Sequence, residues 1–247
     1  MITKAQIKFI QALSRQKYRK EYNLYLVEGD KNGKEWLNSA CNIPQIFGIK
    51  EWLQVHENFL KRHPETEIHI VEDFELEKIT ALKHPQQVLM VVEKPKHQAL
   101  NLDGGEWILF LEKIQDPGNM GTIIRTADWF GISKIFISPD CVEIFNPKVV
   151  QATMGSLLRI NFYEMNIQDL SEIMNSEIPL YAACLNGKNI HEFKNAHPGI
   201  IAFGNESAGL SDELLQLSDM KLTIPCNGNA ESLNVGVATG IFCALLI

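Results

Sequence analysis

The C-terminal stretch LTIPCNGNAESLNVGVATGIFCALL, residues 222–246, decides the fold together with two earlier stretches. These are NMGTIIRTADWFG at 119–131 and IAFGNESAGLS at 201–211; in chain order we name the three motif 1, motif 2 and motif 3. In each motif an apolar run with strand-like or helix-like character meets a short loop rich in Gly, Asn, Ser and Glu. Because α/β proteins place polar groups at the rim of a sheet in this way, we interpret the three motifs as one active site.

The C-terminal half alternates strand-like and helical patterns. The strand-like runs cover residues 107–112, 134–138, 160–164, 179–185, 200–204 and 221–225. Helical patterns cover residues 120–130, 147–158, 167–174, 211–217 and 232–246. Such alternation predicts an α/β fold with a largely parallel sheet covered by helices on both faces.

A second, smaller α/β region is predicted before residue 95. A basic helix up to about Tyr18 is followed by strand-like runs at 24–29, 43–49, 68–72 and 87–93, with helical patterns at 31–40 and 52–62. The stretch EKPKHQALNLDGG that follows combines a proline, mixed charge and a Gly pair, as linkers do. We therefore predict an N-terminal domain at 1–95, a linker at 96–105 and a C-terminal domain, which holds the three motifs, at 106–247.

Composition excludes several classes of protein. With 247 residues and 45% hydrophobic content, the chain can bury a substantial core. We find neither a membrane-spanning run nor the apolar stretch of a signal peptide, and we expect a cytoplasmic protein. The 5 cysteines are scattered without a Cys-x-x-Cys pair and no metal-binding histidine pattern is present, so we expect no disulfide framework and no metal.

The charge is distributed unevenly. Residues 1–100 carry 15 Lys and Arg against 13 Asp and Glu, a net +2, whereas residues 101–247 carry 8 against 17, a net −9. The first twenty residues hold six bases and no acid. Such a run marks either a solvated helix face or a surface that contacts phosphates. For the second reading the candidates for contact with a phosphate polyanion are Arg15, Lys17, Arg19 and Lys20.

Neither a Gly-x-Gly-x-x-Gly turn nor a Walker loop follows the first strand of the predicted sheet, where the chain reads KIQDPGNMG. The loops richest in Gly, Asn and Glu instead lie late in the chain, around Gly204 and Gly228. The sequence thus places the cofactor site at the end of the fold and disfavours a flavin or nicotinamide enzyme.

Over nearly its whole length the chain resembles the SpoU (TrmH) family of RNA 2′-O-ribose methyltransferases, in the SPOUT superfamily. Motif 1 matches through Asn119, Gly121, RTA at 125–127 and Gly131; motif 2 through GNE at 204–206 and GLS at 209–211; motif 3 through IP at 224–225 and ESLN at 231–234. Two positions depart from the pattern: Ser207 stands where Gly is usual, and Cys226 where Met is frequent. The N-terminal part, with VEG at 27–29, resembles the ribosomal-protein-like substrate-binding domain that many members carry. The resemblance thus implies an RNA substrate-binding domain at 1–95 and a SPOUT methyltransferase domain, the catalytic domain, at 106–247.

The resemblance implies a C-terminal domain tied in a trefoil knot, an exception to the rule that chains are unknotted. It also implies S-adenosylmethionine as cofactor and a homodimer. An adenine needs an apolar slot with a few main-chain donors and acceptors. The expected cofactor-binding residues are Gly204, Asn205, Ile224, Pro225 and Leu233.

The resemblance nominates a catalytic set of Asn119, Arg125, Glu206, Ser232 and Asn234. A guanidinium that stays protonated is a poor base, so we favour Arg125 as a clamp for an RNA phosphate. For Asn119, Ser232 and Asn234, helix capping is the structural alternative to contact with substrate. We expect Glu206 to hold Arg125 or a loop amide, because an unpaired buried carboxylate is costly.

The predicted reaction is methylation of a ribose 2′-hydroxyl in structured RNA. A globular domain with a basic helix favours ribosomal RNA of the 23S type over tRNA. A non-catalytic RNA-binding assembly factor and a base-modifying methyltransferase of the same fold remain the alternatives, because fold alone does not determine chemistry.

Overall fold

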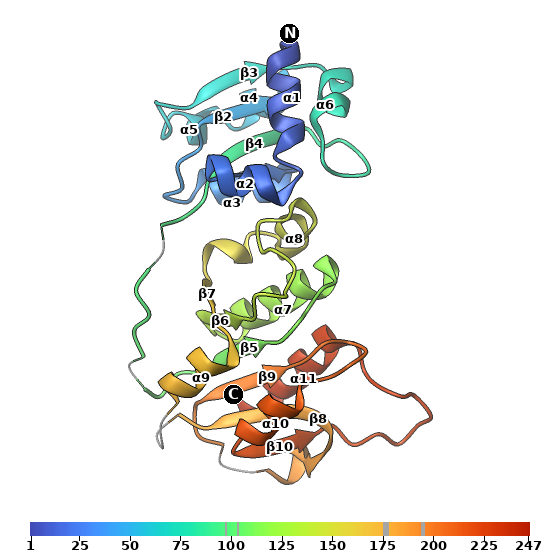
Figure 1. The fold of residues 1–247 in the computed structure, drawn as a ribbon. Helices are drawn as coiled ribbons and strands as arrows, with labels where there is room; N and C mark the ends of the chain where they lie inside the picture. Colours follow the sequence, from blue (N-terminus) through green and yellow to red (C-terminus); the bar gives the residue numbers. More distant parts are fainter. Residues whose placement is uncertain (97, 103, 175–177, 194–195) are drawn as a thin grey trace. The chain divides into compact units, whose positions relative to one another are not determined.

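The protein forms two compact units in a computed structural model that describes residues 1–96, 98–102, 104–174, 178–193 and 196–247 (Figure 1). Unit 1 comprises Met1–His97 and Glu143–Leu158, and unit 2 comprises Gln98–Val142 and Arg159–Ile247. Of the predicted linker, His97 and Asp103 lie outside the described residues. Residues 143–158, which the sequence pattern assigned to the catalytic domain, group with unit 1.

Unit 1 is built on a four-stranded sheet with the order β1-β4-β2-β3, in which only the β2–β3 pair is parallel among the described strands. Its strands are β1 (Leu24–Glu28), β2 (Gln45–Gly48), β3 (Glu67–Ile70) and β4 (Val88–Glu93). Its helices are α1 (Lys4–Ala12), α2 (Gln16–Tyr22), α3 (Asp30–Leu37), α4 (Lys50–Val55), α5 (Glu57–Leu60), α6 (Asp73–Ile79), α8 (Pro147–Thr153) and the 3-10 turn η1 (Ser156–Leu158).

The basic N-terminal segment contains a break that the charge pattern did not predict. The expected single helix is two, α1 and α2, separated at Leu13, Ser14 and Arg15. Arg15 is extended at the start of α2, and the Ser14 hydroxyl donates to the main-chain oxygen of Gln11, as short polar side chains do where helices end. The expected helix at 52–62 is likewise divided into α4 and α5, and α6 was not predicted.

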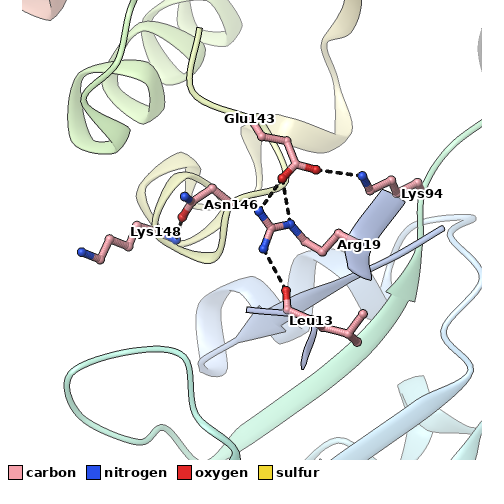
Figure 2. Close-up of polar contacts among 6 residues, drawn as sticks. All are labelled: Leu13, Arg19, Lys94, Glu143, Asn146 and Lys148. Atoms are coloured by element: carbon pink, nitrogen blue, oxygen red, sulfur yellow. Dashed lines mark hydrogen bonds and ion pairs between the residues drawn. The ribbon is translucent and has the colours of Figure 1, made fainter. Parts of the chain in front are cut away.

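Residues 143–158 belong to unit 1 because aromatic, hydrogen-bonding and charged contacts hold them there. The ring of Phe145 lies 4.8 Å from that of Tyr25 on β1, and Asn32 Nδ2 donates to Gln151 Oε1 at 3.0 Å. The charged contact is the ion-pair cluster shown in Figure 2. A segment that lies between two strands of unit 2 in the sequence is thus part of the packing of unit 1.

The ion-pair cluster centres on Arg19, whose side chain is 2% exposed (Figure 2). Arg19 Nε donates to Glu143 Oε2 at 2.9 Å, Nη2 also contacts that oxygen, and Nη1 donates to the main-chain oxygen of Leu13 at 2.8 Å. Lys94 Nζ donates to the other oxygen, Glu143 Oε1, at 2.8 Å and lies 4.9 Å from the ring centre of Phe145. One carboxylate therefore neutralises two cations, one of them buried.

Unit 2 is built on a six-stranded sheet with the order β10-β8-β9-β5-β6-β7, and every described pair is parallel. Its strands are β5 (Ile108–Leu111), β6 (Lys134–Ile137), β7 (Asn161–Glu164), β8 (Leu180–Asn189), β9 (Ile200–Phe203) and β10 (Met220–Thr223). Its helices are α7 (Pro117–Trp129), α9 (Ile167–Ile173), α10 (Asp212–Leu217), α11 (Val235–Leu246) and the 3-10 turn η2 (Ile190–Glu192). This confirms the predicted α/β class with a largely parallel sheet.

The central strand β5 lies between β9 and β6, with Ile108 opposite Ile200 and Leu111 opposite Phe203. The four residues of each of β5 and β9 are buried, as in sheets covered on both faces. Because β5 and β9 are parallel and in register, the loops after Leu111 and Phe203 leave the same edge of the sheet. The first loop leads into α7, which carries motif 1, and the second holds the polar part of motif 2.

The last helix, α11, packs against α7, so motif 3 returns from the edge strand β10 to the helix that follows the central strand β5. The Phe242 ring meets Phe203 edge-on at 5.4 Å. A Cβ at Gly236 would lie 2.8 Å from Thr122 Cγ2, so only glycine allows this approach. The predicted start of the last helix at Ser232 is three residues too early, since α11 begins at Val235.

The described residues contain no helix long and apolar enough to cross a bilayer. They also contain no group of three or more His, Cys, Asp or Glu side chains that could hold a metal ion.

We predict that Glu143→Ala destabilises unit 1 by about 3–5 kcal/mol, because removing one partner of a buried ion pair leaves an uncompensated charge. Urea unfolding followed by tryptophan fluorescence measures the loss. Glu57→Ala is the matched control, because Glu57 pairs with Lys61 on the surface, where the two side chains are 67% and 66% exposed. Equal unfolding midpoints for the two variants would contradict the prediction.

Candidate active site

A chain of side-chain hydrogen bonds joins the three motifs at one edge of the unit 2 sheet. Asn119 Nδ2, on α7, donates to Glu206 Oε1 in motif 2 at 2.7 Å. Asn119 Oδ1 accepts from Asn234 Nδ2 in motif 3 at 2.8 Å. The interpretation of the motifs as one site rests on this bridge, which brings together three of the five catalytic candidates.

The direction of the chain follows from its two ends. An ionised Glu206 can only accept, so the amide of Asn119 must turn its NH₂ toward the carboxylate and its oxygen toward Asn234. Asn234 Oδ1 accepts from the main-chain N–H groups of Gly236 and Val237, at 3.0 and 3.3 Å, and this directs its own NH₂ toward Asn119. Each amide is thus held in one orientation.

The capping alternatives have different outcomes for Asn119 and Asn234. Asp116 caps α7 and accepts from the Asn119 main-chain N–H at 2.8 Å, so Asn119 is not the capping residue and its side chain forms the bridge instead. Asn234 does cap α11, as the capping alternative predicted, and its side chain also donates a hydrogen bond to Asn119. Glu206 accepts from the Asn119 amide rather than from Arg125 or a loop amide.

The loop of motif 2 is a tight turn closed by main-chain bonds between Asn205 and Gly209, at 3.1 and 2.8 Å. A Cβ at Gly204 would lie 2.2 Å from the carbonyl carbon of Gly209, so the turn requires glycine there. Asn205 Oδ1 accepts from the main-chain N–H groups of Ser207 and Ala208. Serine at position 207 therefore does not prevent the turn from forming.

Sequence reasoning missed a second connection between motif 2 and the end of β5. Glu112 is 3% exposed, and its Oε2 accepts from the Ser211 main-chain N–H at 2.7 Å. Asn205 Nδ2 donates to the main-chain oxygen of Lys113 at 3.0 Å. The available signal was a lone Glu directly after four apolar strand residues, where a carboxylate must be buried or turned outward.

The loop after β6 also contacts the segment at the end of β5, residues 111–114. Ser138 Oγ accepts from the Lys113 main-chain N–H at 2.9 Å, and Cys141 Sγ contacts the Ile114 N–H and the Leu111 oxygen, each at 3.3 Å. Burial raises the pKa of the Cys141 thiol above its usual value. Cys141 therefore stays a neutral structural group at the rim of the site.

The other two catalytic candidates, Arg125 and Ser232, are exposed to solvent. Arg125 lies on α7 between inward-facing neighbours, since Ile124 and Ala127 are buried. In the described part of the chain, neither the Arg125 guanidinium nor the Ser232 hydroxyl has a hydrogen-bond or ion-pair partner. Both are therefore free to contact a bound molecule.

The five cofactor candidates follow β9 and β10 in the loops of motifs 2 and 3. Gly204, Asn205, Ile224 and Pro225 are half-buried, and Leu233 is 47% exposed. They supply apolar surface and main-chain polar atoms and no positive charge, which suits a planar organic ring better than a phosphate.

The four RNA-binding candidates divide into two kinds. Arg15, Lys17 and Lys20 are exposed at or within α2, where they can meet a polyanion. Arg19 is buried and held by Glu143 and Leu13, so its guanidinium is not available to an RNA surface. The predicted contact is therefore kept for the three exposed residues alone.

Comparison with known protein families gives a match in each half of the chain. The model described as the SpoU rRNA Methylase family matches residues 106–244, and the MRM3-like substrate binding domain matches residues 4–90. The 23S rRNA (guanosine(2553)-2′-O)-methyltransferase RlmP of Bacillus subtilis is 31% identical over 93% of this chain and 90% of its own length.

Solved structures resemble the whole chain. A putative RNA methyltransferase of the TrmH family from Porphyromonas gingivalis has a TM-score of 0.88 and 33% identity, covering 100% of this chain and 98% of its own. The AdoMet-bound rRNA methyltransferase from Sinorhizobium meliloti has a TM-score of 0.86 and 28% identity, covering 98% of this chain and 94% of its own.

We predict that Asn119→Asp destabilises unit 2 at pH 7 by about 1–3 kcal/mol more than Asn119→Ala. Both variants lose the amide that donates to Glu206, but only the aspartate places a second carboxylate beside it. Urea unfolding of the two variants measures the difference. Equal stability would contradict the prediction, because a carboxylate at position 119 would then meet no repulsion from Glu206.

Proposed function

Because the chain belongs to the SpoU rRNA methylase family, we propose that it methylates a ribose 2′-hydroxyl of ribosomal RNA with S-adenosylmethionine. The carrying observation is the Asn119 bridge, which joins polar residues of all three motifs at one sheet edge. The bound cofactor would give its methyl group to O2′ and leave as S-adenosylhomocysteine, and the proton of the 2′-hydroxyl would pass to water.

The donor set supports S-adenosylmethionine as the cofactor. The related S. meliloti structure contains AdoMet, and the resemblance assigns its site to Gly204, Asn205, Ile224, Pro225 and Leu233. These residues offer an adenosine its apolar contacts and main-chain partners, and the cofactor has no phosphate that would need a cation. When bound, it supplies an activated methyl group on a sulfonium.

The protein's own residues then orient the RNA. Arg125 acts as a clamp for the phosphate next to the target nucleotide, because a guanidinium keeps its charge and bonds phosphate oxygens with fixed geometry. Ser232 faces solvent beside the Asn234 cap and contacts the same substrate. Asn119, Asn234 and Glu206 hold the loops, so that little reorganisation remains when substrate binds.

The target class follows from unit 1 and from the relatives. A substrate-binding domain match, exposed bases at Arg15, Lys17 and Lys20, and a 23S rRNA-modifying relative all favour large-subunit ribosomal RNA. Phosphate contacts of this kind position an RNA, while the nucleotide is selected where its ribose enters the catalytic unit.

We also propose that two copies pair through the apolar side of α11. Val237 and Leu245 of α11 are 51% and 41% exposed, Ile247 directly after it is 47% exposed, and Trp129 at the end of α7 is 86% exposed. Exposed apolar side chains on two helices that pack together support association through this side. Since ribosomal RNA is made in the bacterial cytoplasm and all five cysteines are free, we place the enzyme there.

The decisive experiment is incubation of the protein with methyl-labelled S-adenosylmethionine and unmodified 23S rRNA, 16S rRNA or tRNA, followed by nucleoside analysis by mass spectrometry. We expect label on one ribose of 23S rRNA. Label on a base would replace the proposed reaction by base methylation, and label on tRNA would replace the substrate. The absence of any transfer despite cofactor and RNA binding would favour an assembly factor.

In the same assay, Arg125→Ala should lower turnover by about a thousandfold or more, because the RNA loses its clamp at the reacting ribose. Cofactor affinity, measured by calorimetry, should stay within about twofold of wild type. Loss of cofactor binding in this variant would contradict the assignment of Arg125 to the substrate.

Replacing Arg15, Lys17 and Lys20 together by Gln should weaken rRNA binding and reduce the slope of log affinity against log salt by about 2–3, one step for each lost phosphate contact. Filter binding at salt concentrations from about 50 to about 200 mM measures the affinity and its salt slope. Lys61→Gln with Lys4→Gln and Lys83→Gln removes three other exposed charges of unit 1 and is the control. An unchanged slope in the α2 variant would exclude these contacts.

A further inference from the structure

Lys113, directly beyond the buried strand β5, has a backbone conformation that lysine adopts rarely. Its φ is 55°, in the left-handed region where a Cβ crowds the following carbonyl and where glycine is the usual residue. Asn23 and Met154 are the other non-glycine residues with positive φ in the described chain. They are the C-caps of α2 and α8, where this conformation ends a helix in the ordinary way. Lys113 caps no helix.

Three contacts hold this conformation in place. Ser138 Oγ accepts from the Lys113 main-chain N–H at 2.9 Å, and Asn205 Nδ2 donates to its main-chain oxygen at 3.0 Å. The preceding residue, Glu112, is buried and bonds the Ser211 N–H. The backbone here is therefore determined by groups from two loops, one after β6 and one between β9 and α10, which is how a strained residue persists in a fold.

The Lys113 side chain is exposed to solvent. Glu112 before it is buried, so the two consecutive residues differ in their surroundings as neighbours at a strand end do. Within the described residues the Lys113 ammonium has no hydrogen-bond or ion-pair partner. The two nearest carboxylates along the chain, Glu112 and Asp116, are used by the Ser211 and Asn119 N–H groups. The ammonium is thus a free cation next to the motif 2 loop.

We propose that Lys113 is a substrate-contacting residue whose ammonium binds an RNA phosphate near the methylated ribose. Glycine or asparagine would relieve the backbone strain at this position, so lysine lowers the stability of the fold here. A contact of its charge with substrate would account for a lysine in this place. Residues held in sparsely populated conformations cluster at functional sites for this reason. The inference rests on the proposed function, because it names a contact to the same RNA.

The direct test replaces Lys113 by Asn, which accepts the left-handed conformation and removes the charge. We expect Lys113→Asn to raise the melting temperature while weakening the binding of a 23S rRNA transcript about tenfold, the value of one charge-assisted bond. The salt slope of binding should fall by about 0.7–0.9. Cofactor affinity should be unchanged. Lys113→Arg, which keeps the charge, should retain RNA affinity.

Lys221→Gln is the matched control, since Lys221 is an exposed lysine of unit 2 on the edge strand β10. It should change neither the melting temperature nor the salt slope. The proposal is overturned if Lys113→Asn binds RNA with wild-type affinity and slope, if its loss equals that of the control, or if its melting temperature falls. Wild-type protein that binds the transcript without transferring methyl would refute the proposed reaction, while the slopes would still decide the role of Lys113.

Discussion

The side-chain amide of Asn119 is the interaction on which the catalytic unit depends. Its NH₂ group can satisfy a carboxylate and its oxygen can satisfy a second amide, so one residue joins motif 2 to motif 3 across the first turn of α7. Only glutamine carries the same side-chain amide, with an NH₂ donor and an oxygen acceptor, and glutamine is a methylene longer. The bridge is possible because β5 and β9 are parallel neighbours whose carboxyl ends share an edge. The polar groups of the site are therefore positioned by the sheet and oriented by one another.

The site also depends on close packing of the backbone at two glycines. The turn of motif 2 forms only because Gly204 leaves room for the backbone at Gly209, and α11 reaches α7 only because Gly236 leaves room for Thr122. The first contact closes a local turn, and the second brings motif 3 against motif 1. The return of the chain from β10 to α7 is also the path along which the resemblance predicts a knot, and that knot stays a prediction.

Charge has two separate uses in this protein, and exposure separates them. Arg19 and Lys94 share the carboxylate of Glu143 and hold residues 143–158 within unit 1, which is a structural use (Figure 2). Arg125 and Lys113 are exposed beside the motifs, where their charge is available to a polyanion. A basic side chain that is buried with a carboxylate partner thus holds the fold together. One that is exposed without a partner is available to bind a polyanionic substrate.

The sequence by itself determined the strands, the class of the sheet and the family, because apolar runs of strand length and the Gly-rich motifs are local signals. It also named Asn119, Glu206 and Asn234, but not the bonds between them. Only the tertiary structure decided that Arg19 is buried, that residues 143–158 pack in unit 1, and that Lys113 is strained and exposed. Each of these depends on a partner from a distant part of the chain, such as Glu143, 124 residues beyond Arg19. The local sequence pattern indicates the periodicity of helices and strands and the residues that form turns. Whether a charged side chain is buried depends on which distant segments of the chain pack against it.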